Sequence, residues 1–108
     1  MREIIFYKNY FIEFYVGQPA KVQEKIEYVL NMIRQLDSVP KKFLKQVTNY
    51  KGLYEIRIEY EGNIYRIFSC FDKNNIIVLF NCIKKKSQKT PIKELELAYS
   101  LLKEYRNK

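Results

Sequence analysis

Hydrophobic positions recur along the chain with helical spacing in some segments and with alternating spacing in others. Residues 3–7 form a β-branched and aromatic run that predicts a strand. Aromatic residues at helical spacing over residues 8–16 predict a short helix, which Gly17 and Pro19 end. From residue 20 to residue 36 the apolar positions form one helical stripe that we expect to pack in the core: Val22, Ile26, Val29, Leu30, Ile33 and Leu36.

Alternating apolar and polar positions in the second half of the chain predict an antiparallel meander. Turn residues separate the runs, namely Glu61-Gly62 and the segment 72–74. The predicted strands cover residues 53–60, 63–71 and 75–83.

The remaining segments complete an α+β fold. Residues 40–45 are basic, and we expect one helical turn there, leading into a loop that ends at Gly52. Thr90 is expected to cap a last helix that has Pro91 in its first position. The predicted order is β-α-α-β-β-β-α, with an antiparallel sheet packed on helices in a single domain over residues 1–108.

Composition excludes several kinds of chemistry. The 108 residues carry 20 Lys and Arg against 12 Asp and Glu, a net charge of +8, and include no His and two Cys. Histidine-based catalysis and a closed structural zinc site are therefore excluded, and we expect no cofactor. No apolar run approaches the roughly 20 residues that a membrane span needs. Met1 leads directly into a strand-like segment, so we expect a cytoplasmic protein whose positive charge and aromatic residues suit RNA, DNA or an acidic protein.

The first predicted hairpin places two arginines opposite each other. If Glu61-Gly62 is a two-residue turn, Arg57 pairs with Arg66. Glu55 then lies on the same face beside Arg57. We expect this face to be open, basic and concave.

The second predicted hairpin extends this row onto the last strand. If Phe71 pairs with Ile76, Arg66 faces Asn81. The same pairing collects the apolar residues on the opposite face, which we expect to pack on the helices: Tyr54, Ile56, Ile58, Tyr60, Tyr65, Ile67, Phe71, Ile76, Val78 and Phe80.

Two interpretations of the arginine pair remain open from the residues alone. Opposed like charges destabilise a sheet, so the pair requires either an anionic ligand or a compensating acid such as Glu55 or Glu59. The first interpretation is an anion-binding site, and the second is a solvated ladder of salt bridges. Cys70 and Cys82 lie too far apart for a disulfide in this register, with Cys82 opposite Tyr65, and we interpret both as packing residues.

The two segments that hold these residues resemble a known family. GLYEIRIEYEGNIYRIFSCF and IIVLFNCIKKKSQKTPIKELELA resemble the toxins of bacterial type II toxin-antitoxin modules, in the RelE/ParE superfamily and most closely its HigB-like, phage-derived branch. The resemblance covers nearly the whole chain. Its most specific parts are the segments 52–57, 65–67 and 85–91.

The resemblance implies a function for the basic residues. Ribosome-dependent members of the superfamily cleave mRNA in the ribosomal A site with basic residues on the sheet, and Arg57, Arg66, Lys85 and Lys86 match that set. Glu55 is either a general base or an orienting partner of Arg57. Asn81 stands where HigB-like relatives often have a histidine. Further candidates for RNA binding are Lys84, Lys89, Asn81, Lys51 and Lys45.

The sequence therefore predicts a metal-independent mRNA endonuclease that inhibits translation as a toxin. Its expected partners are the ribosome, mRNA and a cognate antitoxin, of the helix-turn-helix, HigA-like kind that the resemblance suggests, with no membrane. One alternative is a non-enzymatic inhibitor of DNA gyrase, as in the ParE branch. Another is a nucleic-acid-binding module without toxicity.

Overall fold

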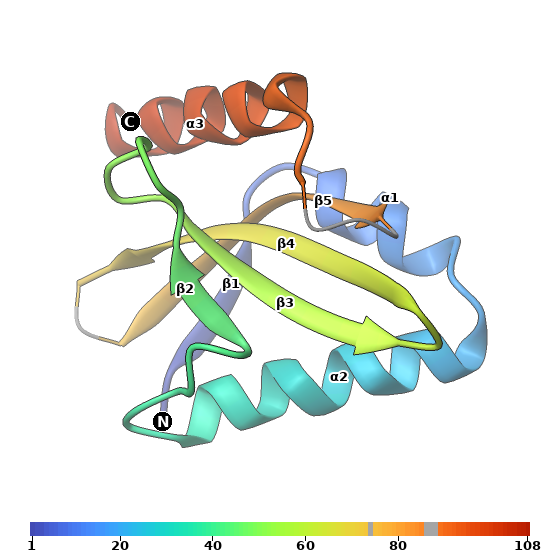
Figure 1. The fold of residues 1–108 in the computed structure, drawn as a ribbon. Coiled ribbons are helices and arrows are strands. Elements are labelled where there is room, and N and C mark those ends of the chain that lie inside the picture. Colours follow the sequence, from blue (N-terminus) through green and yellow to red (C-terminus); the bar gives the residue numbers. More distant parts are fainter. Residues whose placement is uncertain (74, 86–88) are drawn as a thin grey trace.

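Figure 1 shows the computed structural model, which describes residues 1–73, 75–85 and 89–108. Within these ranges the chain forms three helices and a five-stranded sheet. The predicted order of elements is confirmed, with one short strand added after the second helix. The elements are β1 (Glu3–Phe6), α1 (Tyr10–Val16), α2 (Ala20–Gln35), β2 (Leu44–Gln46), β3 (Tyr54–Tyr60), β4 (Asn63–Asp72), β5 (Ile76–Lys85) and α3 (Ile92–Arg106).

The sheet lies between α2 on one side and α3 on the other (Figure 1). Its strand order is β1-β5-β4-β3-β2, with β1 parallel to β5 and the other neighbours antiparallel. The core on the side of α1 and α2 contains Phe11, Val22, Ile26, Val29, Ile33, Ile56, Ile58, Tyr65, Ile67, Ile77 and Leu79. The core on the side of α3 contains Leu53, Phe68, Cys70, Val78, Phe80, Ala98, Leu101 and Leu102. The central strands therefore bury apolar residues on both faces, as strands between two helical layers do.

Residues 44–46 form β2, where the sequence analysis expected part of a helical turn. The carbonyl oxygen of Phe43 accepts a hydrogen bond from the N–H of Arg57 at 2.8 Å, and Lys45 lies opposite Glu55. The helical-turn prediction is wrong for these residues because the outer edge of β3 offers backbone groups that need partners. Pairing with that edge outweighs the weak local preference for a turn.

The hairpin between β3 and β4 has the predicted register. Tyr60 pairs with Asn63, and the two turn residues, Glu61 and Gly62, have φ angles of 49° and 78°. Positive φ at both central positions is the signature of a type I′ turn, whose twist matches that of the flanking strands.

The loop between β4 and β5 is one residue shorter than predicted. Ile76 lies opposite Asp72, whereas the sequence analysis paired it with Phe71. Because a shift by one residue moves every side chain of a strand to the other face, Val78 and Phe80 pack against α3 and not against α2. The expectation that they share a face with the core of α1 and α2 is therefore wrong, and the same correction applies to Ile76.

A β-bulge then shifts the register once more. Two residues of β5, Phe80 and Asn81, stand opposite Phe68 of β4. Phe80 packs in the α3-side core and Asn81 hydrogen-bonds to α3, so both side chains lie on the same side of the sheet. Arg66 consequently lies opposite Ile83, and its predicted pairing with Asn81 is wrong.

α3 begins one residue later than its predicted cap implied. Its N-cap is Pro91, with no side-chain cap hydrogen bond, so Thr90 does not cap the helix. Ile92 is exposed, whereas three residues of the helix are buried: Ala98, Leu101 and Leu102.

Arg2 joins the end of α2 to the start of β1. Its guanidinium donates hydrogen bonds to the carbonyl oxygens of Ile33 at 2.6 Å and Asp37 at 3.0 Å. Its backbone N–H donates to the carbonyl oxygen of Arg34 at 2.8 Å. The bonds to Ile33 and Arg34 satisfy carbonyl groups that a helix leaves unpaired at its C-terminus, and the guanidinium places a positive charge at the negative end of the helix dipole.

The type I′ turn predicts a stabilising substitution. Glu61→Asn is expected to raise the free energy of unfolding by about 0.5–1 kcal/mol, because Asn adopts the left-handed conformation at lower cost than Glu. Gly62→Ala is the control in the opposite direction: no atom lies within 4 Å of the added Cβ, but the φ of 78° strains any side chain. Chemical denaturation measures the free energy of unfolding of the wild type and both variants. An unchanged free energy of unfolding in Glu61→Asn would contradict this explanation.

The two thiols are expected to react slowly in the native protein. Cys70 and Cys82 are free, and Cys82 lies opposite Ile67, not opposite Tyr65 as predicted. Burial raises the pKa of the Cys70 thiol to about 11, and it raises the pKa of the Cys82 thiol as well. The reactive thiolate is therefore scarce at pH 8. Iodoacetamide labelling followed by mass spectrometry should be at least tenfold slower in buffer than in urea, and equal rates would show that a thiol is accessible.

Candidate nucleic-acid interface

Arg57 of β3 and Arg66 of β4 lie directly opposite each other, and Glu55 lies between their guanidinium groups. Glu55 Oε2 accepts a hydrogen bond from Arg66 Nη1 and lies 3.6 Å from Arg57 Nε. Because strand residues two apart share a face, Glu55 and Arg57 project on the same side of β3, toward the arginine of the neighbouring strand. One carboxylate is thus shared by two cations, which offsets the repulsion expected between opposed like charges.

This ion cluster of Glu55, Arg57 and Arg66 is more buried than the sequence analysis expected. The side chains of Arg66 and Glu55 are 3% and 6% exposed, and that of Arg57 is 16% exposed. The expectation of an open face is therefore wrong for Arg66 and Glu55. Phe68, a member of the α3-side core, is the neighbour of Arg66 on that face of β4. Arg57 is the most accessible member of the cluster.

Two lysines lie on the same face as the ion cluster. Lys45 of β2 pairs with Glu55, and directly paired residues share a face. Lys85 of β5 pairs with Ile64, two residues along β4 from Arg66, so it lies one row beyond the arginine pair. Lys85 was predicted near the arginines, whereas Lys45 was predicted only as a residue that binds RNA; the strand register places both on the arginine face.

Other predicted lysines lie elsewhere. Lys84 pairs with Tyr65, which belongs to the core of α1 and α2, so it lies on the opposite face of the sheet from the arginines. If β5 had no bulge, the pairing of Asp72 with Ile76 would put Lys84 on the arginine face and Lys85 on the opposite face. Lys86 lies outside the described residues. Lys89 is exposed in the segment before α3.

Lys51 is separated from the ion cluster along the sheet. It lies in the turn before β3, next to Tyr50, whose ring contacts that of Tyr99 with centroids 5.3 Å apart. On its other side an added Cβ at Gly52 would lie 2.7 Å from Arg106 Nη1, near the end of α3. The structure therefore places Lys51 beside the C-terminal half of α3.

Asn81 contacts a residue that the sequence analysis did not propose for the site. Its Nδ2 donates hydrogen bonds to the main-chain oxygen and to Oε1 of Glu94, each at 3.2 Å. Glu94 belongs to the first turn of α3, where the sequence showed only a carboxylate suited to the positive end of a helix. Its contact with Asn81 depends on the bulge in β5, which the apolar pattern of that strand does not reveal.

The chemistry available at this face is that of guanidinium, ammonium and carboxylate groups. Among residues 1–73, 75–85 and 89–108, no group of three or more His, Cys, Asp or Glu side chains is placed to hold a metal ion. A planar guanidinium can hold two oxygens of one phosphate, which orients the group as well as attracting it. The arrangement is therefore suited to binding a phosphate.

No helix in the described part of the chain is long and apolar enough to cross a membrane.

Two solved structures with a similar fold are toxin-antitoxin complexes. The RelB-RelE antitoxin-toxin complex from Methanococcus jannaschii is 18% identical, with a TM-score of 0.53 over 73% of this chain and 87% of that chain. The archaeal RelE-RelB complex from Pyrococcus horikoshii OT3 is 15% identical, with a TM-score of 0.56 over 82% of this chain and 98% of that chain. At these identities the likeness shows a shared fold.

Sequence comparison gives the family. No curated protein matches the chain. The model of the family described as "Phage derived protein Gp49-like (DUF891)" matches residues 13–103, which include α2, the whole sheet except β1, and most of α3. The chain therefore belongs to the Gp49-like family of phage-derived proteins, a RelE-like toxin family, and it has the RelE fold.

Proposed function

We propose that this protein is the toxin of a type II toxin-antitoxin module, and that it cleaves mRNA on the ribosome without a metal ion. The observation that carries the proposal is the pair of opposed arginines on one face of a RelE-type sheet, with Lys45 and Lys85 on the same face. The net charge of +8 supports binding to a phosphate backbone.

Arg57 is the residue that contacts the scissile phosphate in this proposal. Its side chain is the most exposed of the ion cluster, and its guanidinium can donate to two non-bridging oxygens at once. Cleavage by a 2′-hydroxyl adds negative charge to the phosphate in the transition state. A fixed cation at this position stabilises that charge.

Glu55 and Arg66 are positioning residues. A carboxylate that accepts from Arg66 and lies 3.6 Å from Arg57 Nε is committed to these cations, so it is a poor candidate for the general base. Its role is to hold Arg57 in one orientation. Arg66 adds positive charge beneath the phosphate without reaching solvent itself.

Lys85 is the candidate for protonating the departing 5′-oxygen. It lies on the arginine face, diagonal to Arg66, at a separation of roughly 7–8 Å between backbone positions. Lys86, Lys89 and Lys45 are the further candidates for phosphate binding in this proposal. With so few acid and base groups, positioning of the mRNA by the ribosome supplies much of the rate enhancement, so naked RNA is a poor substrate.

A neutralising partner is part of the proposal. Two solved structures with this fold are complexes of RelE with RelB, and a basic surface is covered most readily by an acidic or inserted segment. We propose a helix-turn-helix, HigA-like antitoxin encoded beside this protein. Co-expression should restore the growth of cells that the protein inhibits.

Arg57→Ala is expected to reduce ribosome-dependent mRNA cleavage by about 100-fold or more, because an oriented transition-state cation is lost. Stability should change little, since Glu55 keeps its contact with Arg66. Arg57→Lys should recover only part of the activity, because an ammonium lacks the planar fork. Primer extension on mRNA from induced cells measures the cuts.

Lys21→Ala is the matched control for that experiment, because Lys21 is exposed in α2, on the side of the sheet opposite the arginines. It should cleave as the wild type does. Growth arrest with gyrase-dependent DNA damage and intact mRNA would overturn the nuclease proposal in favour of gyrase inhibition.

Glu55→Gln is expected to impair both stability and cleavage. Removing one partner from a buried ion pair costs about 3–5 kcal/mol, and here two cations would lose a shared carboxylate. The matched control is Glu59→Gln, an exposed position on the same face of β3 that should lose less than about 1 kcal/mol. If the Glu55→Gln variant has the same free energy of unfolding as the wild type but no longer cleaves mRNA, Glu55 is a catalytic base and not a positioning residue.

A further inference from the structure

Aromatic and basic side chains gather where the turn before β3 meets the C-terminal half of α3 (Figure 1). The rings of Tyr50 and Tyr99 make an edge-to-face contact, with centroids 5.3 Å apart and planes inclined by 73°. Lys103 Nζ lies 4.8 Å from the centroid of the Tyr99 ring. With two further cations these residues form a surface that we call the tyrosine platform: Tyr50, Lys51, Tyr99, Lys103 and Arg106.

The turn that carries Tyr50 and Lys51 is fixed by its backbone and by α3. The N–H of Leu53 donates to the carbonyl oxygen of Tyr50 at 3.0 Å. Gly52 has a φ angle of 87°, and a Cβ added there would lie 2.7 Å from Arg106 Nη1. The glycine therefore lets the guanidinium of Arg106 lie against the turn, which brings a cation of α3 next to Lys51. A hollow of about 500 Å³ lies on the same turn, lined by residues 46–51.

Neighbouring carboxylates do not neutralise the charge of the platform. Lys51, Lys103 and Arg106 are exposed, and they make no ion pair with any residue that the structure describes. Glu104 follows Lys103 in the chain, but its carboxylate pairs with Lys8 at 2.6 Å. Cations beside aromatic rings suit a ligand that carries both phosphates and flat bases, because the cations attract the phosphates and every base can stack on a ring.

Lys45 lies between the platform and the ion cluster. It is exposed, and it is paired with Glu55 on the arginine face. β3 runs from Tyr54, just beyond the platform, to Arg57 and further. These two residues are separated by roughly 10 Å at the rise of a strand. At about 3.4 Å for each stacked nucleotide, this distance corresponds to about three nucleotides.

We propose that the tyrosine platform binds single-stranded RNA a few nucleotides away from the phosphate that Arg57 contacts. A base stacks on a tyrosine ring, since in an edge-to-face pair the ring that presents its edge keeps both faces free of its partner. The lysines and Arg106 hold the phosphates on either side of that base. The inference rests on the proposed RNA substrate, and it assigns a binding site for the nucleotides beside the cleavage site. Stacking of this kind tolerates any base.

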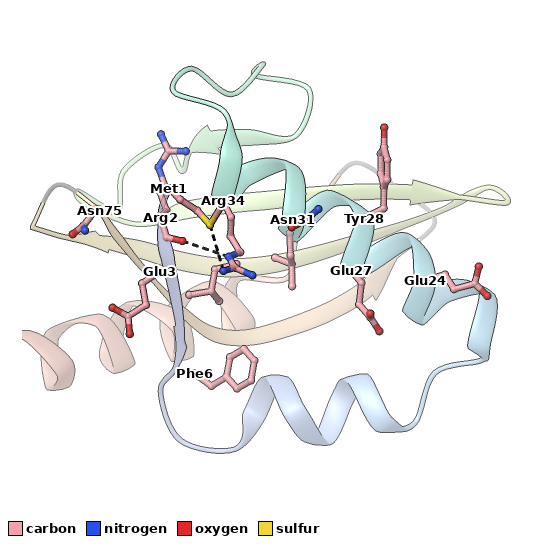
Figure 2. A pocket seen from close by; sticks show the side chains of 12 residues that line it. Met1, Arg2, Glu3, Phe6, Glu24, Glu27, Tyr28, Asn31, Arg34 and Asn75 are labelled. Atoms are coloured by element: carbon pink, nitrogen blue, oxygen red, sulfur yellow. Dashed lines mark hydrogen bonds between the residues drawn. The ribbon is translucent and has the colours of Figure 1, made fainter.

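A larger groove, of about 950 Å³ between β1 and α2, is a poorer site for RNA (Figure 2). Acidic side chains line it together with basic ones, among them Glu24 and Glu27 alongside Arg2 and Arg34. Mixed charge does not select a uniform polyanion, whereas the platform presents cations alone beside its rings.

An acidic polypeptide is a poorer occupant of the platform than RNA. Its carboxylates can pair with Lys51 and Lys103, but they offer no flat group to stack on Tyr50 or Tyr99. The contribution of the rings to binding therefore distinguishes the two occupants.

The test uses the full-length protein and a single-stranded oligouridine of about ten nucleotides. The RNA carries 2′-O-methyl groups, so it has no 2′-hydroxyl and cannot be cleaved. Fluorescence anisotropy measures its Kd at several salt concentrations. Lys51→Ala combined with Lys103→Ala should weaken binding about fivefold or more, and it should lower the slope of log K against log salt by about 1.4, because each phosphate contact contributes about 0.7.

The matched control combines Lys21→Ala with Lys25→Ala. It removes the same charge from α2, which packs on the other side of the sheet. RNA affinity should change by less than about twofold, since charges beyond a Debye length are screened.

Stacking is tested separately from charge. Tyr50→Leu keeps an apolar side chain without the ring, and it should weaken RNA binding about threefold or more at an unchanged salt slope. In the wild type, photo-crosslinking of an oligouridine that contains 5-iodouridine should join the RNA to Tyr50 or Tyr99, as mass spectrometry detects. This second measurement decides the question if the Tyr50→Leu variant does not fold. Glu96→Gln removes an exposed carboxylate one turn before Tyr99 and should tighten binding.

The inference is overturned if the crosslinks lie only on other residues, or if the two double-lysine variants bind the RNA equally well. It is also overturned if oligoglutamate of the same length binds as tightly as the RNA and Tyr50→Leu binds the RNA as the wild type does. A protein that cuts mRNA on ribosomes but fails these tests keeps the nuclease proposal and loses this site. Crosslinks at Tyr50 without any cleavage give the reverse result.

Discussion

Two guanidinium groups remain together inside this sheet because one carboxylate lies between them. Arg57 and Arg66 occupy directly paired positions, where their charges would repel strongly away from water, and Glu55 offsets that repulsion. The cluster as a whole keeps a single positive charge. Such an arrangement fixes the orientation of Arg57 before any ligand arrives, so a ligand would have to order this side chain very little.

Local patterns in the sequence were sufficient to predict most of the elements and the arginine pair. A two-residue turn leaves one possible register for its hairpin, and this is why the pairing of Arg57 with Arg66 could be derived from Glu61-Gly62. β2 could not be predicted, because its residues have no strong strand propensity and form a strand only by pairing with the edge of β3. The burial of Arg66 depends on how closely the α3-side core packs, which strand periodicity does not report.

The two sides of the molecule have different physical characters. The α3 side of the sheet joins an apolar core to a cluster of charges, and its accessible groups there are cationic. The edge formed by β1 and α2 has exposed aromatic rings, backbone groups and charges of both signs. The first surface suits a uniform polyanion, and the second differs from it in carrying both acidic and basic side chains.

The extra residue in β5 has a consequence for reading related sequences. Because of this residue, Lys85 and not Lys84 stands on the arginine face of the sheet. A homologue that lacks the bulge would present the preceding position instead. An ungapped alignment of this strand would then compare residues from opposite faces of the sheet. Such a homologue could lack a lysine at the aligned position and still carry one on the same face, one position earlier.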